Sequence, residues 1–204
     1  MRWQNLRRVT DSPAIFKLSQ VLLAPRAWLN IQRLLKKHLP PDPVGTRRAL
    51  DVGCGPSSPL FHLNLNPVGI DISEKNIREY CKQKGRTACR ASADRLPFKN
   101  ASFEIVCSIG VLHHLSRDES KEAVGEMVRV CGRNGSVIIF DAVLPRSFWA
   151  RPLAWVLRKN DRGGFVRDEA ETLEALPDKR LWKIERHVYT PTGLECLLMI
   201  FRRT

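Results

Sequence analysis

The chain has 204 residues, 34 Lys and Arg against 21 Asp and Glu, and a formal net charge of +13 at pH 7. Its length fits one domain with a short appendage, and a hydrophobic fraction of 43% excludes a disordered chain. The opening residues lack the apolar stretch of a secretory signal, and no apolar run approaches the length of a membrane span. We therefore expect a cytoplasmic protein whose cysteines are small buried side chains rather than disulfide partners.

The basic excess lies at the two ends of the chain. Residues 1–48 contain ten basic and two acidic side chains, residues 49–142 contain twelve and eleven, and residues 143–204 contain twelve and eight. Basic flanks attract nucleic acid, anionic lipid or an acidic substrate, although they can also be no more than a solvated surface. The nearly neutral centre is what an ordinary enzyme core would show.

The first 45 residues predict a basic, amphipathic helical segment. Residues 12–39 have helical spacing interrupted at Pro25, with Trp28, Ile31 and Leu35 on one side and arginines and lysines on the other. The proline-rich residues 40–43 end this helix. Such a helix either packs on the following domain or lies on an anionic membrane, so peripheral attachment to the inner membrane face is an alternative location.

Strand and helix patterns alternate over residues 46–204. The expected strands are Arg48–Val52, Val68–Ile72, Thr87–Ser92, Phe103–Ile109 and Gly135–Phe140, and the expected helices are Glu74–Lys84 and Arg117–Val130. Residues 145–178 interrupt the pattern as a helical insert, which contains an acidic helix over residues 168–176, and Trp182–Tyr189 with Leu194–Arg202 forms a hairpin. This alternation predicts an α/β domain with a mostly parallel sheet.

The first strand ends in a glycine turn, Gly53-Cys54-Gly55. Glycines here let the backbone approach a ligand closely. Asp71 ends the second strand, where a carboxylate can accept the ribose hydroxyls of a nucleotide. The third glycine of a dinucleotide fingerprint is missing, and so is a Gly-Lys-Ser/Thr phosphate loop. Binding of a nucleoside without a pyrophosphate therefore fits better, although a solvated turn and a helix-capping aspartate remain the simpler explanation.

Four segments resemble the motifs of the class I S-adenosylmethionine (SAM)-dependent methyltransferases. Leu50–Gly55 is similar to their first motif, Val68–Ser73 to the ribose-binding strand, and Ala93–Phe98 to the motif around the adenine pocket. Val111–Leu115 is similar to the segment after strand four in the type 11 subgroup. The resemblance covers most of the chain outside residues 1–45 and 145–178.

This resemblance implies a Rossmann-like fold: a seven-stranded, mostly parallel sheet with an antiparallel last strand and helices on both faces. It implies SAM as cofactor and S-adenosylhomocysteine (SAH) as product. The implied cofactor contacts are Asp51, Gly53, Cys54, Gly55, Asp71, Ile72, Ala93, Asp94, Arg95, Ser108, Ile109 and Gly110. Among these, Asp71 would contact the ribose and Asp94 the adenine amino group, with Leu96 and Phe98 beside the ring. Pro56-Ser57 departs from the usual small residue plus glycine, and the short first crossover predicts an open pocket.

Methyl transfer from a sulfonium needs alignment of the acceptor and, for some acceptors, one general base. The candidates are His114, His113 and Asp141, because they follow the strands that form the floor of the pocket. Either histidine could instead be structural. No third ligand follows the histidine pair at a familiar spacing, so we expect no metal. Trp149, Trp155 and Phe165 in the insert are expected to line the acceptor pocket together with His113, or else to be core anchors.

Three classes of function compete. The first is methylation of a small-molecule or lipid-like acceptor on O, N or C, including a lipid head group or a quinone at an anionic membrane. The second is an RNA methyltransferase, and the third is a non-catalytic SAM-binding module. The chain lacks the Asn-Pro-Pro-Tyr and Pro-Cys signatures of enzymes that methylate a flipped base. On this ground the sequence predicts a small or lipid-like acceptor and makes nucleic acid an unlikely partner.

Overall fold

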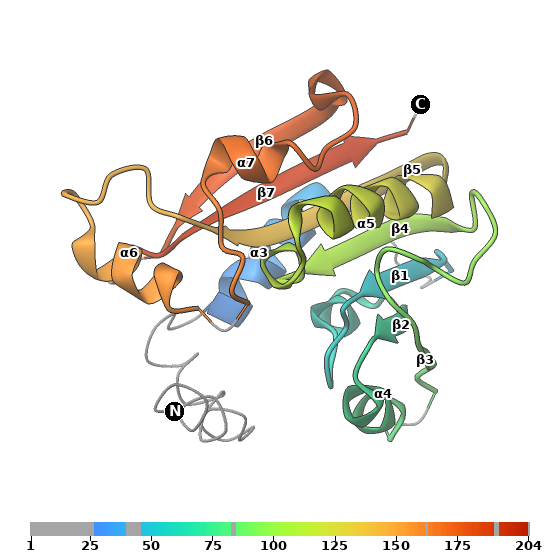
Figure 1. Ribbon diagram of the computed structural model, residues 1–204. Helices are drawn as coiled ribbons and strands as arrows, with labels where there is room; N and C mark the ends of the chain where they lie inside the picture. The colour runs from blue at the N-terminus through green and yellow to red at the C-terminus, as the bar shows by residue number, and fades with distance from the viewer. Residues whose placement is uncertain (1–26, 40–45, 83–84, 162, 190–191, 204) are drawn as a thin grey trace.

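The computed structural model describes residues 27–39, 46–82, 85–161, 163–189 and 192–203. Its sheet has seven strands in the order β3-β2-β1-β4-β5-β7-β6 (Figure 1). The strands are β1 (Ala49–Val52), β2 (Val68–Asp71), β3 (Ala88–Arg90), β4 (Phe103–Ile109), β5 (Cys131–Val143), β6 (Trp182–Val188) and β7 (Glu195–Arg202). The part of the expected N-terminal helix from residue 12 to residue 26 lies outside the described residues.

The first five strands run parallel, and β7 lies antiparallel between β5 and β6. This confirms the expected Rossmann-like sheet with an antiparallel last strand. β1 pairs with β2 on one side and with β4 on the other, so the strand order reverses there. In open α/β sheets, ligands bind outside the carboxyl ends of the strands at such a reversal. The fold therefore places a binding crevice after β1 and β4.

Helices cover both faces of the sheet and close two apolar cores. The helices are α3 (Ala27–His38), α4 (Glu74–Cys81), α5 (Arg117–Val130), α6 (Pro152–Lys159) and α7 (Glu169–Leu173), with 3₁₀ helices η1 (Pro59–Leu63), η2 (Leu112–His114) and η3 (Lys179–Leu181). One core joins α5 and the end of α7 to the sheet, and the other joins α3, η1 and α6 to its opposite face. Long βαβ crossovers put helices on the faces of parallel sheets, as here.

The apolar side of the N-terminal helix packs onto the sheet domain. Leu35 and Leu39 are buried in the same cluster as Leu60 and Ile138, and Arg202 Nη2 donates to the His38 carbonyl at 3.2 Å. These leucines are therefore not free to enter a bilayer. Within the described residues, every helix is too short or too polar to cross a membrane.

Several element boundaries differ from the sequence pattern. β5 begins at Cys131 rather than at Gly135, because an irregularity in its pairing with β4 lets Cys131 pair with Phe103 before regular pairing resumes. The first crossover contains only the 3₁₀ helix η1, which Ser58 caps by accepting from the Leu60 amide. α4 ends at Cys81 instead of residue 84, and α7 covers only Glu169–Leu173 of the acidic segment.

Candidate active site

The glycine turn after β1 leaves open space above it. The amides of Gly53 and Cys54 both donate to the carbonyl of Ile70, at 2.7 and 2.9 Å, which fixes the turn to β2. Gly53 and Gly55 have φ values of 74° and 58°, in the region that favours glycine. A Cβ on Gly53 would lie 2.2 Å from Val111 Cγ2, whereas a Cβ on Gly55 would meet nothing within 4 Å. The backbone at Gly55 is therefore accessible to a ligand.

Asp71 connects this turn to the start of α4. Its Oδ2 accepts the Gly55 amide at 3.0 Å, and its Oδ1 accepts the Ser73 amide at 2.8 Å and Asn76 Nδ2 at 3.2 Å. A carboxylate has about four acceptor sites. Three are used within the protein, which leaves Asp71 about one for a ligand hydroxyl.

Seven buried side-chain polar atoms lack a hydrogen-bond partner among the described residues, and two of them lie at this edge of the sheet. They are Asp51 Oδ2 at the end of β1 and Ser108 Oγ near the end of the neighbouring β4. Burial raises the pKa of Asp51 to about 7. Buried polar groups are normally hydrogen-bonded, so each needs an unseen partner such as a ligand or water. With the open turn at Gly55, these atoms fit a polar, nucleoside-sized cofactor.

The two apolar side chains expected beside the adenine ring, Leu96 and Phe98, pack against other apolar side chains of the protein. Leu96 is buried in the core, and the Phe98 ring packs edge-on against Phe103, with 4.9 Å between centroids. Ile72, in contrast, is 68% exposed directly after Asp71. Ile72 is therefore an accessible apolar side chain next to Asp71.

The loop that carries Ala93, Asp94 and Arg95 is fixed to α5. Glu126 accepts the Leu96 amide at 2.8 Å, and Arg129 donates to the carbonyls of Leu96 and Phe98. The Asp94 side chain makes no hydrogen bond or ion pair with the described part of the chain. This loop is thus rigidly placed while its carboxylate remains available.

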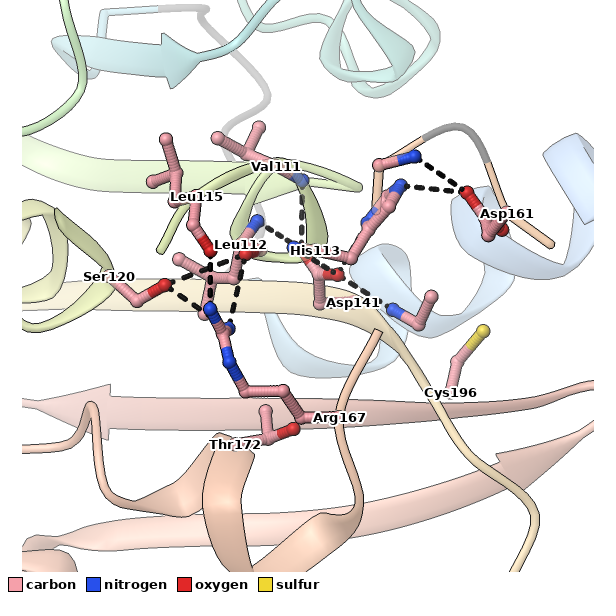
Figure 2. Close-up of polar contacts among 12 residues, drawn as sticks. Val111, Leu112, His113, Leu115, Ser120, Asp141, Asp161, Arg167, Thr172 and Cys196 are labelled. Carbon is pink, nitrogen blue, oxygen red and sulfur yellow. Dashed lines mark hydrogen bonds and ion pairs between the residues drawn. The ribbon is translucent and has the colours of Figure 1, made fainter. Parts of the chain in front are cut away.

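The Asp141 carboxylate accepts hydrogen bonds from backbone amides at the start of η2 (Figure 2). It is 1% exposed, and its Oδ2 accepts the amides of Val111 and Leu112 at 2.8 and 2.6 Å. Its Oδ1 accepts the amides of His113 and Ala142 at 3.2 and 2.8 Å. Four backbone donors thus converge on one buried carboxylate at the end of β5. This arrangement ties the loop before η2 and its first residues to the end of β5.

His113 lies between two carboxylates. Its Nδ1 is 2.7 Å from Asp141 Oδ1, and its Nε2 is 3.7 Å from Asp161 Oδ1. Burial favours the neutral ring, but the two carboxylates outweigh burial and raise the pKa of His113. Partial burial and the neighbouring His113 lower the pKa of His114. The pair therefore divides into a more basic, enclosed ring and a less basic, more accessible one.

The insert closes onto η2 through residues that the sequence interpretation missed. Asp161 faces His113, pairs with Arg158 at 3.2 Å and accepts the Gly163 amide at 3.2 Å. A Cβ on Gly163 would lie 2.2 Å from the His113 carbonyl oxygen. The Asp-Arg-Gly-Gly run at residues 161–164 was the only sequence signal for this contact.

Arg167 is a second residue that links the insert to η2. Its guanidinium donates to the carbonyls of Leu112 and Leu115 and to Ser120 Oγ (Figure 2). The carbonyls of the first residue of η2 and of the residue that follows η2 thus accept from a side chain 52 residues or more away in sequence. No local pattern could have shown this contact.

The aromatic residues expected at the acceptor pocket lie in different surroundings. Trp149 is 88% exposed, whereas Trp155 is half-buried and packs edge-on against Phe148. Phe165 is 47% exposed, and its amide donates to the His113 carbonyl at 3.1 Å. Phe165 is thus the aromatic residue that the structure brings next to the histidine pair. Across the described ranges, no group of three or more His, Cys, Asp or Glu residues could bind a metal.

Comparisons with known proteins find methyltransferases among the proteins that this chain resembles. A family model described as "Methyltransferase domain" matches residues 50–139. The chain is 40% identical over 95 residues to an Arabidopsis thaliana tRNA (carboxymethyluridine(34)-5-O)-methyltransferase, covering 44% of this chain and 22% of that protein. It is 28% identical over 139 residues to a human probable tRNA methyltransferase 9B, covering 67% and 29%. The chain therefore spans less than a third of the length of these relatives.

Two solved structures share the fold over nearly the whole chain. One is from a complex between the Haloferax volcanii Trm112 methyltransferase activator and a putative methyltransferase (TM-score 0.71, 14% identity, 95% and 96% covered). The other is a Thermotoga maritima SAM-dependent methyltransferase (TM-score 0.68, 16% identity, 99% and 100% covered).

The relatives correct one expectation from the sequence. Several of them are named as tRNA methyltransferases, so the interpretation that made nucleic acid an unlikely partner is wrong. It relied on missing signatures of enzymes that methylate a flipped base, whereas the Arabidopsis protein's name specifies an oxygen. The matched domain, the strand order and the shared fold together identify this chain as carrying a class I SAM-dependent methyltransferase domain of the type 11 group, whose cofactor is SAM.

Proposed function

We propose that this protein transfers a methyl group from SAM to an oxygen of a modified base in RNA, with tRNA as the substrate class. The observation that carries the proposal is the match of its central domain to tRNA methyltransferases. The net charge of +13 supports it, because phosphate neutralisation supplies most of the affinity in RNA binding. A lipid or small-molecule acceptor is the competing possibility.

The cofactor would lie across the carboxyl ends of β1, β2 and β4. Gly53, Cys54 and Gly55 would face its methionine part, and Asp71 a ribose hydroxyl, with Ile72 beside the sugar. The remaining contacts assigned to it are Asp51, Ala93, Asp94, Arg95, Ser108, Ile109 and Gly110. The open position at Gly55 and the unpartnered Asp51 and Ser108 atoms support this placement. When bound, SAM supplies a methyl group already activated as a sulfonium.

The acceptor would approach η2, where the two histidines and Phe165 lie. A carboxylate acceptor, as the Arabidopsis relative's name suggests, would take the methyl group directly, and the electron pair of the broken carbon–sulfur bond would stay on sulfur. A carboxylate has no proton to lose, so this reaction needs no general base. His113, whose two ring nitrogens face Asp141 and Asp161, would fix the position of η2 beside such an acceptor. His114 is the candidate base for an acceptor that does carry a proton.

Transfer of labelled methyl groups tests the proposal. The protein is incubated with methyl-labelled SAM and, separately, with total tRNA, total lipid and small-molecule extracts. We expect label in tRNA, and release of the label as methanol under mild alkali, because a methyl ester hydrolyses there. Label in lipid or small molecules but not in RNA would overturn the proposal. Asp71→Ala, deficient in cofactor binding, is the control for contaminating activity.

Two glycine substitutions separate cofactor binding from folding. In Gly55→Ala the new Cβ meets only open space, so we expect a folding cost of about 1 kcal/mol from the positive φ. The same Cβ enters the proposed cofactor position, so SAH affinity should fall at least about tenfold, or about 1.4 kcal/mol. In Gly53→Ala the contact with Val111 should lower the free energy of unfolding by about 2–3 kcal/mol. Calorimetry and urea unfolding measure the two effects, and full SAH affinity in Gly55→Ala would contradict the placement.

A further inference from the structure

An exposed apolar surface lies on the insert after β5. It consists of four side chains, here called the aromatic patch: Phe148, Trp149, Leu153 and Val156. Their exposed fractions are 40%, 88%, 62% and 47%. Single exposed apolar side chains are normal, but four of them in one short segment are typical of a binding surface. The patch therefore needs a partner.

The patch is held in a defined shape. The Phe148 ring packs edge-on against Trp149 and Trp155, with centroid distances of 5.2 and 5.3 Å and interplanar angles of 79° and 87°. Ser147 Oγ accepts the Ala150 amide at 3.2 Å and closes the turn before α6. Trp149 thus has a supported ring that remains almost fully open to solvent. An ordered, accessible ring of this kind can stack against a planar group.

Two ion pairs lie near the patch, and in each the arginine is more exposed to solvent than the glutamate. Arg146 pairs with Glu169, but the arginine side chain is 69% exposed and the glutamate 27%. Arg151 pairs with Glu195, at 38% against 2%. The carboxylates of these pairs are thus covered and the guanidinium groups face solvent.

Lys159 adds a third cation to this surface. It is exposed at the end of α6, and its ammonium group is 5.3 Å from the Trp155 ring centroid. With Arg146 and Arg151, it gives the surface around the patch an outward positive charge, which suits a polyanion.

The patch also lies on the edge of the sheet where the acceptor must arrive. β5 ends at Val143, two residues after Asp141, and the chain then leads directly into the patch and α6 (Figure 1). The same insert continues to Asp161 and Phe165 at the histidine pair. A polymer bound with one base at η2 would therefore pass this surface.

We propose that the aromatic patch binds single-stranded RNA, with an unpaired base stacked on Trp149 and with Arg146 and Lys159 facing neighbouring phosphates. The inference rests on the proposed RNA acceptor and assigns a second RNA contact outside the methyl-transfer site. Base stacking on aromatic rings combined with backbone-facing cations is how proteins bind unpaired strands with little sequence preference. A bilayer would also accept Trp149 together with the aliphatic side chains, but the chain leads from this patch to the histidine pair, which favours the RNA strand that the proposed acceptor belongs to.

Fluorescence anisotropy with a labelled, uridine-rich single-stranded RNA of about 15 nucleotides tests the inference, since sites of this kind span roughly 4–16 nucleotides. Trp149→Ala should weaken binding about 5- to 30-fold, and Trp149→Phe should recover most of the affinity. Leu181→Ala is the control, because it removes another exposed apolar side chain (58%), which lies outside the patch on η3. Unchanged SAH binding in every variant shows that each one folds.

The outcomes separate this inference from the proposed function. If tRNA accepts label but Trp149→Ala binds RNA as tightly as the wild type, the patch assignment is wrong and the function stands. If RNA binding depends on Trp149 but no RNA accepts label, the proposed function is wrong and the contact stands. Flotation with anionic vesicles completes the test: vesicle binding lost in Trp149→Ala, with RNA binding intact, would identify a lipid surface and overturn the inference.

Discussion

Asp141→Ala is expected to lower the free energy of unfolding by about 3–5 kcal/mol, the usual cost of removing one partner from a buried charge pair. The carboxylate is 1% exposed and accepts four backbone amides besides contacting His113. Alanine would leave those amides without an acceptor and the imidazole without its counter-charge. Urea unfolding measures the loss. Glu122→Ala, on the exposed side of α5, is the control and should change stability by less than about 0.5 kcal/mol.

The pair should also leave a signature in the pH dependence of stability. Burial disfavours the Asp141 charge, but His113 and the backbone amides outweigh it and lower the Asp141 pKa. Its contribution is thus present above its ordinary value of 3.8 and is lost as pH falls through the folded pKa. The His113 pKa is raised, so its contribution is complete below 6.5 and is lost as pH rises through the folded pKa.

The difference in stability between wild type and Asp141→Ala should therefore be largest between about pH 4 and pH 6.5 and smaller on either side. Asp141→Asn keeps one oxygen acceptor but no charge, so its loss should be smaller than that of alanine at every pH in this window. A difference that stays flat from pH 4 to pH 9 would show that the two side chains are not coupled.

Local sequence patterns were enough to predict strands and helices of the sheet domain. Phe103–Ile109 is a continuous buried strand and was predicted with the observed bounds. Arg117–Val130 was also predicted correctly, and Ser116 and Glu119 form a capping box at its start. Strands alternating with helices can pair in few ways, since crossovers are right-handed and short. The position of Asp71 beside the glycine turn followed from that topology.

The rest of the site depends on contacts between distant residues. Asp161 and Arg167 reach η2 from the insert, and nothing in their neighbours specifies a partner 48 residues or more away. Asp141 was predicted as a possible base, and a sequence does not show that four amides converge on its carboxylate. From the sequence, Trp149 could line the acceptor pocket or be a buried core residue, whereas in the structure it is exposed to solvent.

Asp71→Ala is expected to weaken SAH binding about 10- to 150-fold, or about 1.5–3 kcal/mol, the range for a lost hydrogen bond to a charged group. Part of this loss would come from the protein itself, because Asp71 accepts the Gly55 and Ser73 amides and Asn76 Nδ2. Asn76→Ala estimates that part: it removes one of these bonds and keeps the carboxylate. We expect Asn76→Ala to weaken SAH binding by less than about threefold.

Analogues of SAH that lack one ribose hydroxyl isolate the contact with the ligand. Asp71 has about one acceptor site left, so it should bind one of the two hydroxyls rather than both. Wild type should then lose about tenfold in affinity for either the 2′-deoxy or the 3′-deoxy analogue and little for the other, whereas Asp71→Ala should bind SAH and both analogues alike. The coupling free energy from this cycle, measured by calorimetry, reports the hydrogen bond itself. If Asp71→Ala discriminates between the analogues as wild type does, Asp71 only shapes the glycine turn, and the ribose must be bound by another residue.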